Sequence, residues 1–246
     1  MIKFIGNILF KIYNLFFSYL DKISNVNNLR NYDYYEKGFG ILNLENEIYY
    51  NHHKFSTIRI NKYLKKIIFS EKEIINILNL IFIKNKLKEM ITKTTGFNYS
   101  IDFFTAYRTE SIDQEDEKYG WYANHWHKDK PFSKYFIKLI IPLENIEEDM
   151  GGIELVGVDK SKNKNFKSLK ADFKMVTSKN EILIFSPNLC YHKAGKQASG
   201  KIRQQIMLQL NPSKDWAYNS KLFNIQKNRE PKFPFFSYFF LKKIKI

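Results

Sequence analysis

Residues 181–192 read EILIFSPNLCYH, a short apolar run that ends at a Ser-Pro-Asn turn and leads to a histidine. Apolar runs of similar length recur on both sides of it, separated by turn residues such as Gly151-Gly152 and Ser199-Gly200. These runs are YSIDFFTAYR (99–108), KYFIKLIIPL (134–143), GGIELVGV (151–158), FKMVT (173–177) and KIRQQIMLQL (201–210). Short strands in this arrangement predict an all-β sandwich or barrel and argue against a parallel α/β sheet.

The part of the chain before these runs has a different pattern. Residues 70–94 begin with a capping box, Ser70 to Glu73, continue with apolar residues at helical spacing, and stop before Gly96. Residues 24–66 are rich in Tyr and Asn, and we expect irregular structure with short helices there. The predicted fold is therefore mainly β with helical additions, a barrel core preceded by N-terminal helices.

We expect one domain, because a chain of 246 residues can bury one core of this kind. It divides into three parts. Residues 1–95 form a helical or irregular N-terminal part that packs on the barrel, residues 96–215 form the β core, and residues 216–246 form a basic, aromatic C-terminal extension.

The composition and charge restrict the classes of partner. A hydrophobic content of 44% supplies a core and excludes a disordered chain. The 40 Lys and Arg against 25 Asp and Glu suit a nucleic acid, an anionic membrane surface or an anionic substrate, although a bias toward Lys, Asn and Ile typical of AT-rich coding sequence competes with that interpretation. Interleaved aromatic and basic residues on a strand platform are lacking, so we expect no nucleic-acid partner.

The redox environment is indicated by the single cysteine, Cys190. One cysteine cannot form an intramolecular disulfide, which favours a reducing compartment in which ferrous iron would also survive. We therefore expect a cytoplasmic protein, with a peripheral contact at the inner face of the membrane as a further option that its two ends suggest.

Both ends of the chain are amphipathic. In residues 1–23, MIKFIGNILFKIYNLFFSYLDKI, the polar residues recur at spacings of three and four, which predicts an amphipathic helix and argues against a signal peptide or a membrane span. Residues 231–246, PKFPFFSYFFLKKIKI, place aromatic rings beside lysines. Each end suits either an anionic bilayer surface or the interface of a homo-oligomer.

A candidate metal site lies in NHWHKDKPF, residues 124–132. Alternate residues of a strand point to the same face, so His125, His127 and Asp129 would share one. The third ligand would come from His192, the only other histidine in the β-rich half. Two sets of ligands remain open on this pattern: two histidines with a carboxylate, as in non-haem Fe(II) oxygenases, or three histidines, as in a zinc site.

The strand that follows His192 carries a candidate anion-binding residue. In KIRQQIMLQL, one face carries Arg203, Gln205, Met207 and Gln209, and the other carries Ile202, Ile206, Leu208 and Leu210. The guanidinium of Arg203 could hold a carboxylate through two parallel hydrogen bonds, a geometry that lysine cannot supply. Tyr107 and Gln205 could donate hydrogen bonds to the same ligand or to a substrate, and Lys138 could pair with an anion.

The chain resembles the phytanoyl-CoA dioxygenase-like branch of the Fe(II)/2-oxoglutarate-dependent oxygenases between about residues 101 and 212. The resemblance rests on HKD at 127–129, MGGIELV at 150–156, EILIFSPNLCYH ending at His192, and Arg203. It implies a double-stranded β-helix (a jelly roll, cupin-like) in which His127, Asp129 and His192 bind iron and Arg203 binds the distal carboxylate of 2-oxoglutarate. His125 then lies beside the site without binding the metal.

The same resemblance implies the reaction: O₂ and 2-oxoglutarate are consumed, a substrate is hydroxylated, and succinate and CO₂ are released. Halogenating members of the family lack the carboxylate ligand, so Asp129 favours hydroxylation. A Pro-Gly-Ser-His-like loop of many members is replaced by LVGVDKSKNK at 155–164, which changes the substrate entrance. We expect a small or lipid-linked anionic substrate. The alternatives are a zinc or three-histidine cupin-type metalloprotein and a non-catalytic jelly-roll module that binds membrane or a polyanion.

Overall fold

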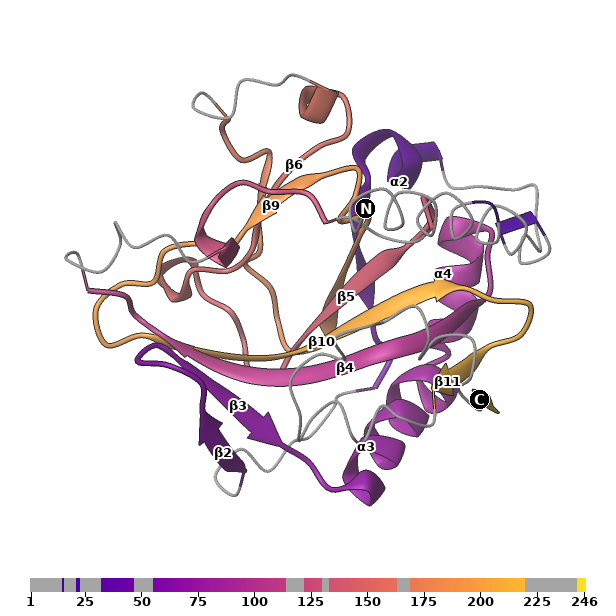
Figure 1. Ribbon diagram of the computed structural model, residues 1–246, viewed down its shortest axis with the longest axis horizontal. Helices are drawn as coiled ribbons and strands as arrows, with labels where there is room; N and C mark the ends of the chain where they lie inside the picture. The colour runs from indigo at the N-terminus through magenta and orange to yellow at the C-terminus, as the bar shows by residue number, and fades with distance from the viewer. Residues whose placement is uncertain are drawn as a thin grey trace, which may run out of the picture.

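A computed structural model describes residues 15, 21–22, 32–46, 55–113, 122–129, 133–162, 169–219 and 243–246. Most of its strands join one mixed sheet in the order β1-β8-β5-β10-β4-β11-β12, with β3 paired to β4 and β2 paired to β3 (Figure 1). The strands are β1 (Phe39–Asn43), β2 (Ser56–Arg59), β3 (Leu64–Ile68), β4 (Tyr99–Glu110), β5 (Ile137–Pro142), β8 (Glu181–Phe185), β10 (Ile202–Pro212), β11 (Ala217–Asn219) and β12 (Lys243–Lys245).

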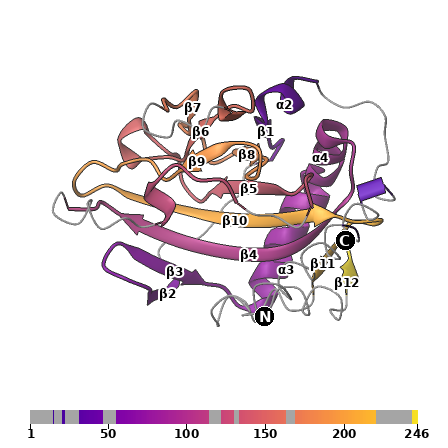
Figure 2. The same ribbon diagram turned by 45° about the horizontal axis from the view of Figure 1, so that its top comes forward.

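A second, smaller sheet lies on one side of β5, β10 and β4 (Figures 1 and 2). Its strands are β6 (Glu154–Val156), β7 (Phe173–Lys174) and β9 (Tyr191–Lys193), in the order β7-β6-β9. An apolar cluster fills the space between the two sheets, with Ile140 and Leu183 from the larger sheet and Leu155 from the smaller one. Two facing sheets around one interior, antiparallel except where β11 pairs with β4, form the jelly roll that the family resemblance implies.

The two faces of β10 pack in two different interiors of the molecule. Ile206, Leu208 and Leu210 are fully buried in a cluster that also contains the helices of the N-terminal part. Because side chains alternate along a strand, Arg203 and Gln205 point to the other face, toward the interior between the sheets, where Met207 packs. Those two polar residues are buried as well, and their burial pattern marks the inside of the barrel as the place for a polar site.

The N-terminal helices cover the outer face of the larger sheet (Figure 2). They are α3 (Glu71–Leu78), the π-helix η2 (Asn79–Lys84) and α4 (Leu87–Thr95), and α2 (Tyr32–Lys37) lies earlier in the chain. The two predicted ends of the helical region 70–94 are confirmed. Ser70 and Glu73 form the capping box at the start of α3, and Gly96, with φ 78°, ends α4. The predicted helix is nevertheless interrupted at Asn85 and Lys86. The Asn85 amide donates to the Leu80 carbonyl, and Lys86 adopts φ 53°.

The expectation of irregular structure with short helices in residues 24–66 is wrong where the described part of this segment forms strands, at residues 39–43, 56–59 and 64–66. β1 pairs with β8, and β3 pairs with β2 and β4, so this segment supplies both an edge of the larger sheet and a hairpin against β4. The partner strands lie far along the chain, and hydrogen bonds to them outweigh weak local propensity. Among the described residues of this segment, α2 alone matches the expected short helices.

The amphipathic ends lie largely outside the described residues. Of residues 1–23, only 15 and 21–22 are described, and of residues 231–246, only 243–246. The Asp21 carboxylate accepts a hydrogen bond of 2.5 Å from the Ser133 hydroxyl, which joins the first segment to the turn before β5. No helix in the described ranges is long and apolar enough to cross a membrane.

Candidate metal centre

The segment that contains His127 and Asp129 is held against the strand that contains His192. The backbone N–H of His127 donates to the His192 carbonyl (3.1 Å), and the N–H of His192 donates back to the His127 carbonyl (2.9 Å). The N–H of Asp129 donates to the Pro187 carbonyl in the turn between β8 and β9 (2.8 Å). These backbone bonds bring three side chains, from two segments far apart in the sequence, to one point.

The three side chains have the arrangement of a metal site. One possible ligand atom from each of His127, Asp129 and His192 lies within 4.8 Å of the others. Asp129 Oδ1 is 3.9 Å from His127 Nε2 and 3.7 Å from His192 Nε2. Two imidazole nitrogens and one carboxylate oxygen around a common point are the donors of the facial triad of non-haem iron sites.

The other ring nitrogens face backbone carbonyls, which fixes how the rings are turned. His127 Nδ1 lies 2.7 Å from the His125 carbonyl, and His192 Nδ1 lies 3.3 Å from the Cys190 carbonyl. An Nδ1–H that donates to a carbonyl leaves Nε2 as the atom with a lone pair, the usual arrangement of histidines that bind metals.

His125 therefore contributes its carbonyl and not its ring. Its side chain is exposed and does not belong to the cluster of candidate ligands among the described residues. The strand alternation that would place His125 beside His127 does not apply, because residues 125–129 make one isolated bridge to β9 and form no regular strand. The three-histidine set is not assembled here.

His192 has the environment of a neutral imidazole that lacks one partner. Its ring packs edge to face on Phe185, with centroids 5.2 Å apart, and the residue is 4% exposed. Burial, with the nearby Lys138 cation, lowers the pKa of His192 to about 3, so the ring is neutral near pH 7. Its buried Nε2 makes no hydrogen bond within the described part of the chain, and a metal ion would supply the missing contact.

Arg203, Tyr107 and Gln205 form a second polar cluster inside the barrel. Gln205 and Tyr107 are paired across β10 and β4, and the Gln205 amide donates to the Tyr107 hydroxyl (2.5 Å). Burial raises the pKa of Tyr107 even though the Arg203 charge opposes the shift. All three predicted co-substrate residues thus come together on adjacent strands.

Arg203 is a buried cation without a balancing carboxylate among the described residues. It is 3% exposed, and burial lowers its pKa. Its Nη1 makes one long hydrogen bond of 3.5 Å to the Met150 carbonyl, and its Nε has no partner in the part of the chain that the structure describes. Burying a guanidinium with unused donors is costly, so the cluster suits an anion that accepts from them.

The glycine-rich turn after η4 (Glu148–Met150) brings that carbonyl close to Arg203. A Cβ on Gly152 would lie 1.9 Å from the Met175 carbonyl oxygen, and one on Gly195 would lie 2.3 Å from the Gly152 oxygen. The Gly195 N–H donates to the Gly152 carbonyl (3.1 Å). Only glycine permits backbones to approach this closely, which explains the MGG pattern in physical terms.

Lys138 contacts one candidate ligand through its side chain, and Cys190 lies two residues before another. Lys138, buried on the inward face of β5, places Nζ 2.5 Å from Asp129 Oδ2. The sequence indicates an anion partner for this lysine but not that the partner is a candidate metal ligand. Cys190 is fully buried, and burial raises the pKa of its thiol to about 12, which fits a small apolar residue and not a reactive thiol.

Comparisons with known proteins identify the fold. The crystal structure of the non-heme alpha ketoglutarate dependent epimerase SnoN from nogalamycin biosynthesis is similar with a TM-score of 0.53 and 9% identity, over 87% of this chain and 91% of that one. HygX from Streptomyces hygroscopicus, with nickel and 2-oxoglutarate bound, matches with a TM-score of 0.49 and 9% identity, over 77% and 89%. No protein-family model and no curated protein matches the chain. The likeness to SnoN confirms the predicted jelly-roll fold.

Proposed function

We propose that the chain is an Fe(II)- and 2-oxoglutarate-dependent dioxygenase that hydroxylates a small or lipid-linked anionic substrate. The observation that carries the proposal is the presence, in one barrel, of the three-donor cluster and of buried Arg203 without a described carboxylate partner. A metal site alone fits many proteins. A metal site together with an arginine that needs a carboxylate fits a dicarboxylic co-substrate.

Each protein group has a defined task in this proposal. His127 and His192 offer Nε2 because their Nδ1 atoms face carbonyls, and Asp129 offers Oδ1. Arg203 binds the distal carboxylate of 2-oxoglutarate, and Tyr107 and Gln205 donate beside it. The metal, O₂ and 2-oxoglutarate would supply the oxidation of a substrate C–H to C–OH, with release of succinate and CO₂.

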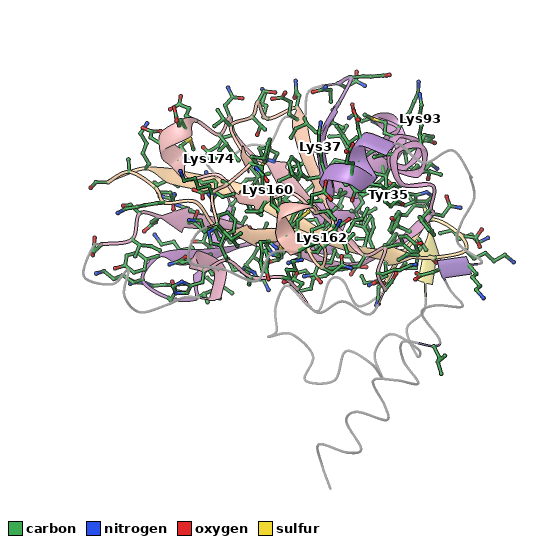
Figure 3. All side chains as sticks on the ribbon, turned by 90° about the horizontal axis from the view of Figure 1, so that it is seen from above. Tyr35, Lys37, Lys93, Lys160, Lys162 and Lys174 are labelled. Carbon is green, nitrogen blue, oxygen red and sulfur yellow. The ribbon has the colours of Figure 1, made fainter. Side chains whose placement is uncertain are left out.

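An anionic substrate is supported by lysines on the face of the molecule that carries η5 (Lys160–Lys162), the turn joined to the metal segment. Figure 3 shows lysines of α2, η5 and β7 on the side viewed from above: Lys37, Lys160, Lys162 and Lys174. The η5 turn is joined to the metal segment, since Lys128 Nζ donates to the Ser161 carbonyl (2.9 Å). Two of these lysines already pair with Asp172 and Asp159, so the support is the local excess of cations and not any single contact.

The experiment measures succinate formed from 2-oxoglutarate with Fe(II), first without and then with candidate anionic metabolites. We expect turnover in the wild type and its loss in Asp129→Ala, which removes one of the three donors. His125→Ala is the matched control, because its ring lies outside the cluster and its carbonyl is retained. Equal succinate formation in wild type and Asp129→Ala would refute the assignment, and tight zinc without any dependence on 2-oxoglutarate would favour the zinc metalloprotein.

The likeness to SnoN gives one specific reason to consider epimerisation as a second outcome at the same centre. The two outcomes differ in the mass of the product. A hydroxylated product contains one more oxygen atom than the substrate, whereas an epimer has an unchanged mass. Mass spectrometry of the product made under labelled O₂ therefore separates the two functions once a substrate has been found.

A further inference from the structure

Lys138 is an unusual residue for the inside of a barrel. It is 8% exposed and lies on β5, which is buried along its whole length. Its neighbours across the sheet are Phe185 on β8 and Gln209 on β10, neither of which carries a charge. A buried ammonium group is stable only when it is paired, and the partner it has is Asp129.

The two oxygens of Asp129 face different groups. Oδ1 lies 3.7 and 3.9 Å from the Nε2 atoms of His192 and His127, so one metal ion can reach all three atoms, because two metal–ligand bonds of about 2.1 Å span at most about 4.2 Å. Oδ2 lies 2.5 Å from Lys138 Nζ, a charge-assisted hydrogen bond. One oxygen is thus directed to the metal position and the other is held away from it.

Lys138 does not share the task of Arg203. Its partner on β10 is Gln209, six positions beyond Arg203 (209 − 203), so the two backbone positions are roughly 20 Å apart along that strand. Arg203 lies beside Tyr107 and Gln205, whereas Lys138 lies beside the candidate ligands. The barrel interior therefore contains two separate cationic positions.

We propose that Lys138 is a positioning residue that holds Oδ2 of Asp129, so that Asp129 binds the metal through Oδ1 alone. The inference rests on the proposed function, because it concerns the same metal site. A carboxylate that binds through one oxygen occupies one coordination position, and a carboxylate that binds through both occupies two. Lys138 thereby keeps positions open for the co-substrate and O₂.

A positioning role and a purely electrostatic role of Lys138 predict opposite changes in metal affinity when the lysine is removed. If Lys138 were only a positive charge near the site, its removal would tighten binding of a divalent cation, because like charges repel. If it positions Asp129, its removal weakens binding, and loss of such an outer partner of a ligand typically costs roughly 10- to 100-fold in metal affinity.

The test uses Co(II) binding to the full chain, followed by titration and by the ligand-field absorption bands of the bound ion. We expect Lys138→Met to raise the Kd for Co(II) about tenfold or more and to change the bands, because Asp129 becomes free to bind through both oxygens. Lys138→Arg, which retains a charged donor, should restore the wild-type bands. Lys128→Met is the matched control, since Lys128 is a neighbouring lysine that contacts Ser161 and the Tyr191 ring instead of Asp129.

The outcomes separate the two proposals. A wild type that binds no Co(II) refutes the proposed metal site and this inference with it. A wild type that binds Co(II), with Lys138→Met binding as tightly or more tightly and with unchanged bands, refutes the inference alone. If Lys138→Met does not fold, Lys138→Gln, which keeps a shorter neutral donor, is expected to weaken binding less, and tighter binding by that variant would equally overturn the role.

Discussion

At the scale of single residues, Arg203 is a buried cation whose hydrogen-bond donors the described protein groups do not satisfy. It has a buried Nε without a partner and one long bond to a carbonyl. We expect Arg203→Lys to raise the Kd for 2-oxoglutarate, measured calorimetrically on the Co(II) form without O₂. Lysine keeps the charge but loses the paired hydrogen bonds, and one charge-assisted hydrogen bond is worth about 1.5–3 kcal/mol, which is roughly 10- to 150-fold in affinity.

The matched control for this prediction is Arg59→Lys. Arg59 lies on the exposed strand β2 and its Nε donates only to the Asn61 carbonyl (3.3 Å). It should bind 2-oxoglutarate like the wild type. An unchanged affinity in Arg203→Lys would mean that the co-substrate carboxylate binds elsewhere in the barrel.

The residues of the metal centre show what a sequence can and cannot resolve at this scale. Alternation along a strand groups His125, His127 and Asp129, and the resemblance to a family, not the alternation, prefers the last two. In the structure, His125 is set apart from the other two for a different reason. Residues 125–129 make one bridge to β9, and His125 turns its carbonyl, not its ring, toward the His127 ring. The contact between Lys138 and Asp129 depends on how β5 lies in the barrel, which sequence spacing does not contain.

At the scale of elements, the glycine-rich turn after η4 is a point of close backbone contact. We expect Gly152→Ala to lower the free energy of unfolding by about 3 kcal/mol, because the new Cβ would lie 1.9 Å from the Met175 carbonyl oxygen and the backbone would have to move. Urea unfolding followed by circular dichroism measures the change.

Gly40→Ala provides the comparison for this substitution. A Cβ on Gly40 would meet its nearest atoms, in Ile184 and Tyr34, at 3.9 Å, an ordinary contact. The variant should be unchanged or more stable by up to about 1 kcal/mol, since alanine restricts the unfolded chain. Equal unfolding free energies for the two variants would show that the turn can relax around an added methyl group.

Elements whose stability is local are the ones that sequence predicts well. Ser70, Glu73 and Gly96 mark the ends of the helical region through contacts within a few residues of themselves. The break at Asn85 involves Asn46, whose N–H donates to the Asn85 side chain from 39 positions away. Strands β1 and β3 depend on pairing with β8 and β4, so their Tyr- and Asn-rich sequence alone does not indicate them.

At the scale of the whole molecule, the larger sheet joins two interiors. Its outer face packs with the N-terminal helices in the larger apolar cluster, and its inner face borders the metal centre. Trp216, after β10, packs on Phe82 of η2 with centroids 5.7 Å apart, so the helices and the sheet share one core. Stabilisation of the inner face should therefore stabilise the helices on the other side.

This connection predicts that metal binding stabilises the entire described fold. The candidate ligands come from the segment before β5 and from β9, so an ion would join two parts of the barrel. At a Co(II) concentration of 100 times its Kd, we expect the free energy of unfolding to rise by about 2.7 kcal/mol, less any binding to the unfolded chain. The rise should be equal when measured by the circular dichroism of the helices and by the reactivity of Cys190, the buried thiol beside β9. Asp129→Ala should lose the effect and His125→Ala should keep it, whereas a rise seen by the thiol but not by the helices would mean that the two sides of the sheet unfold separately.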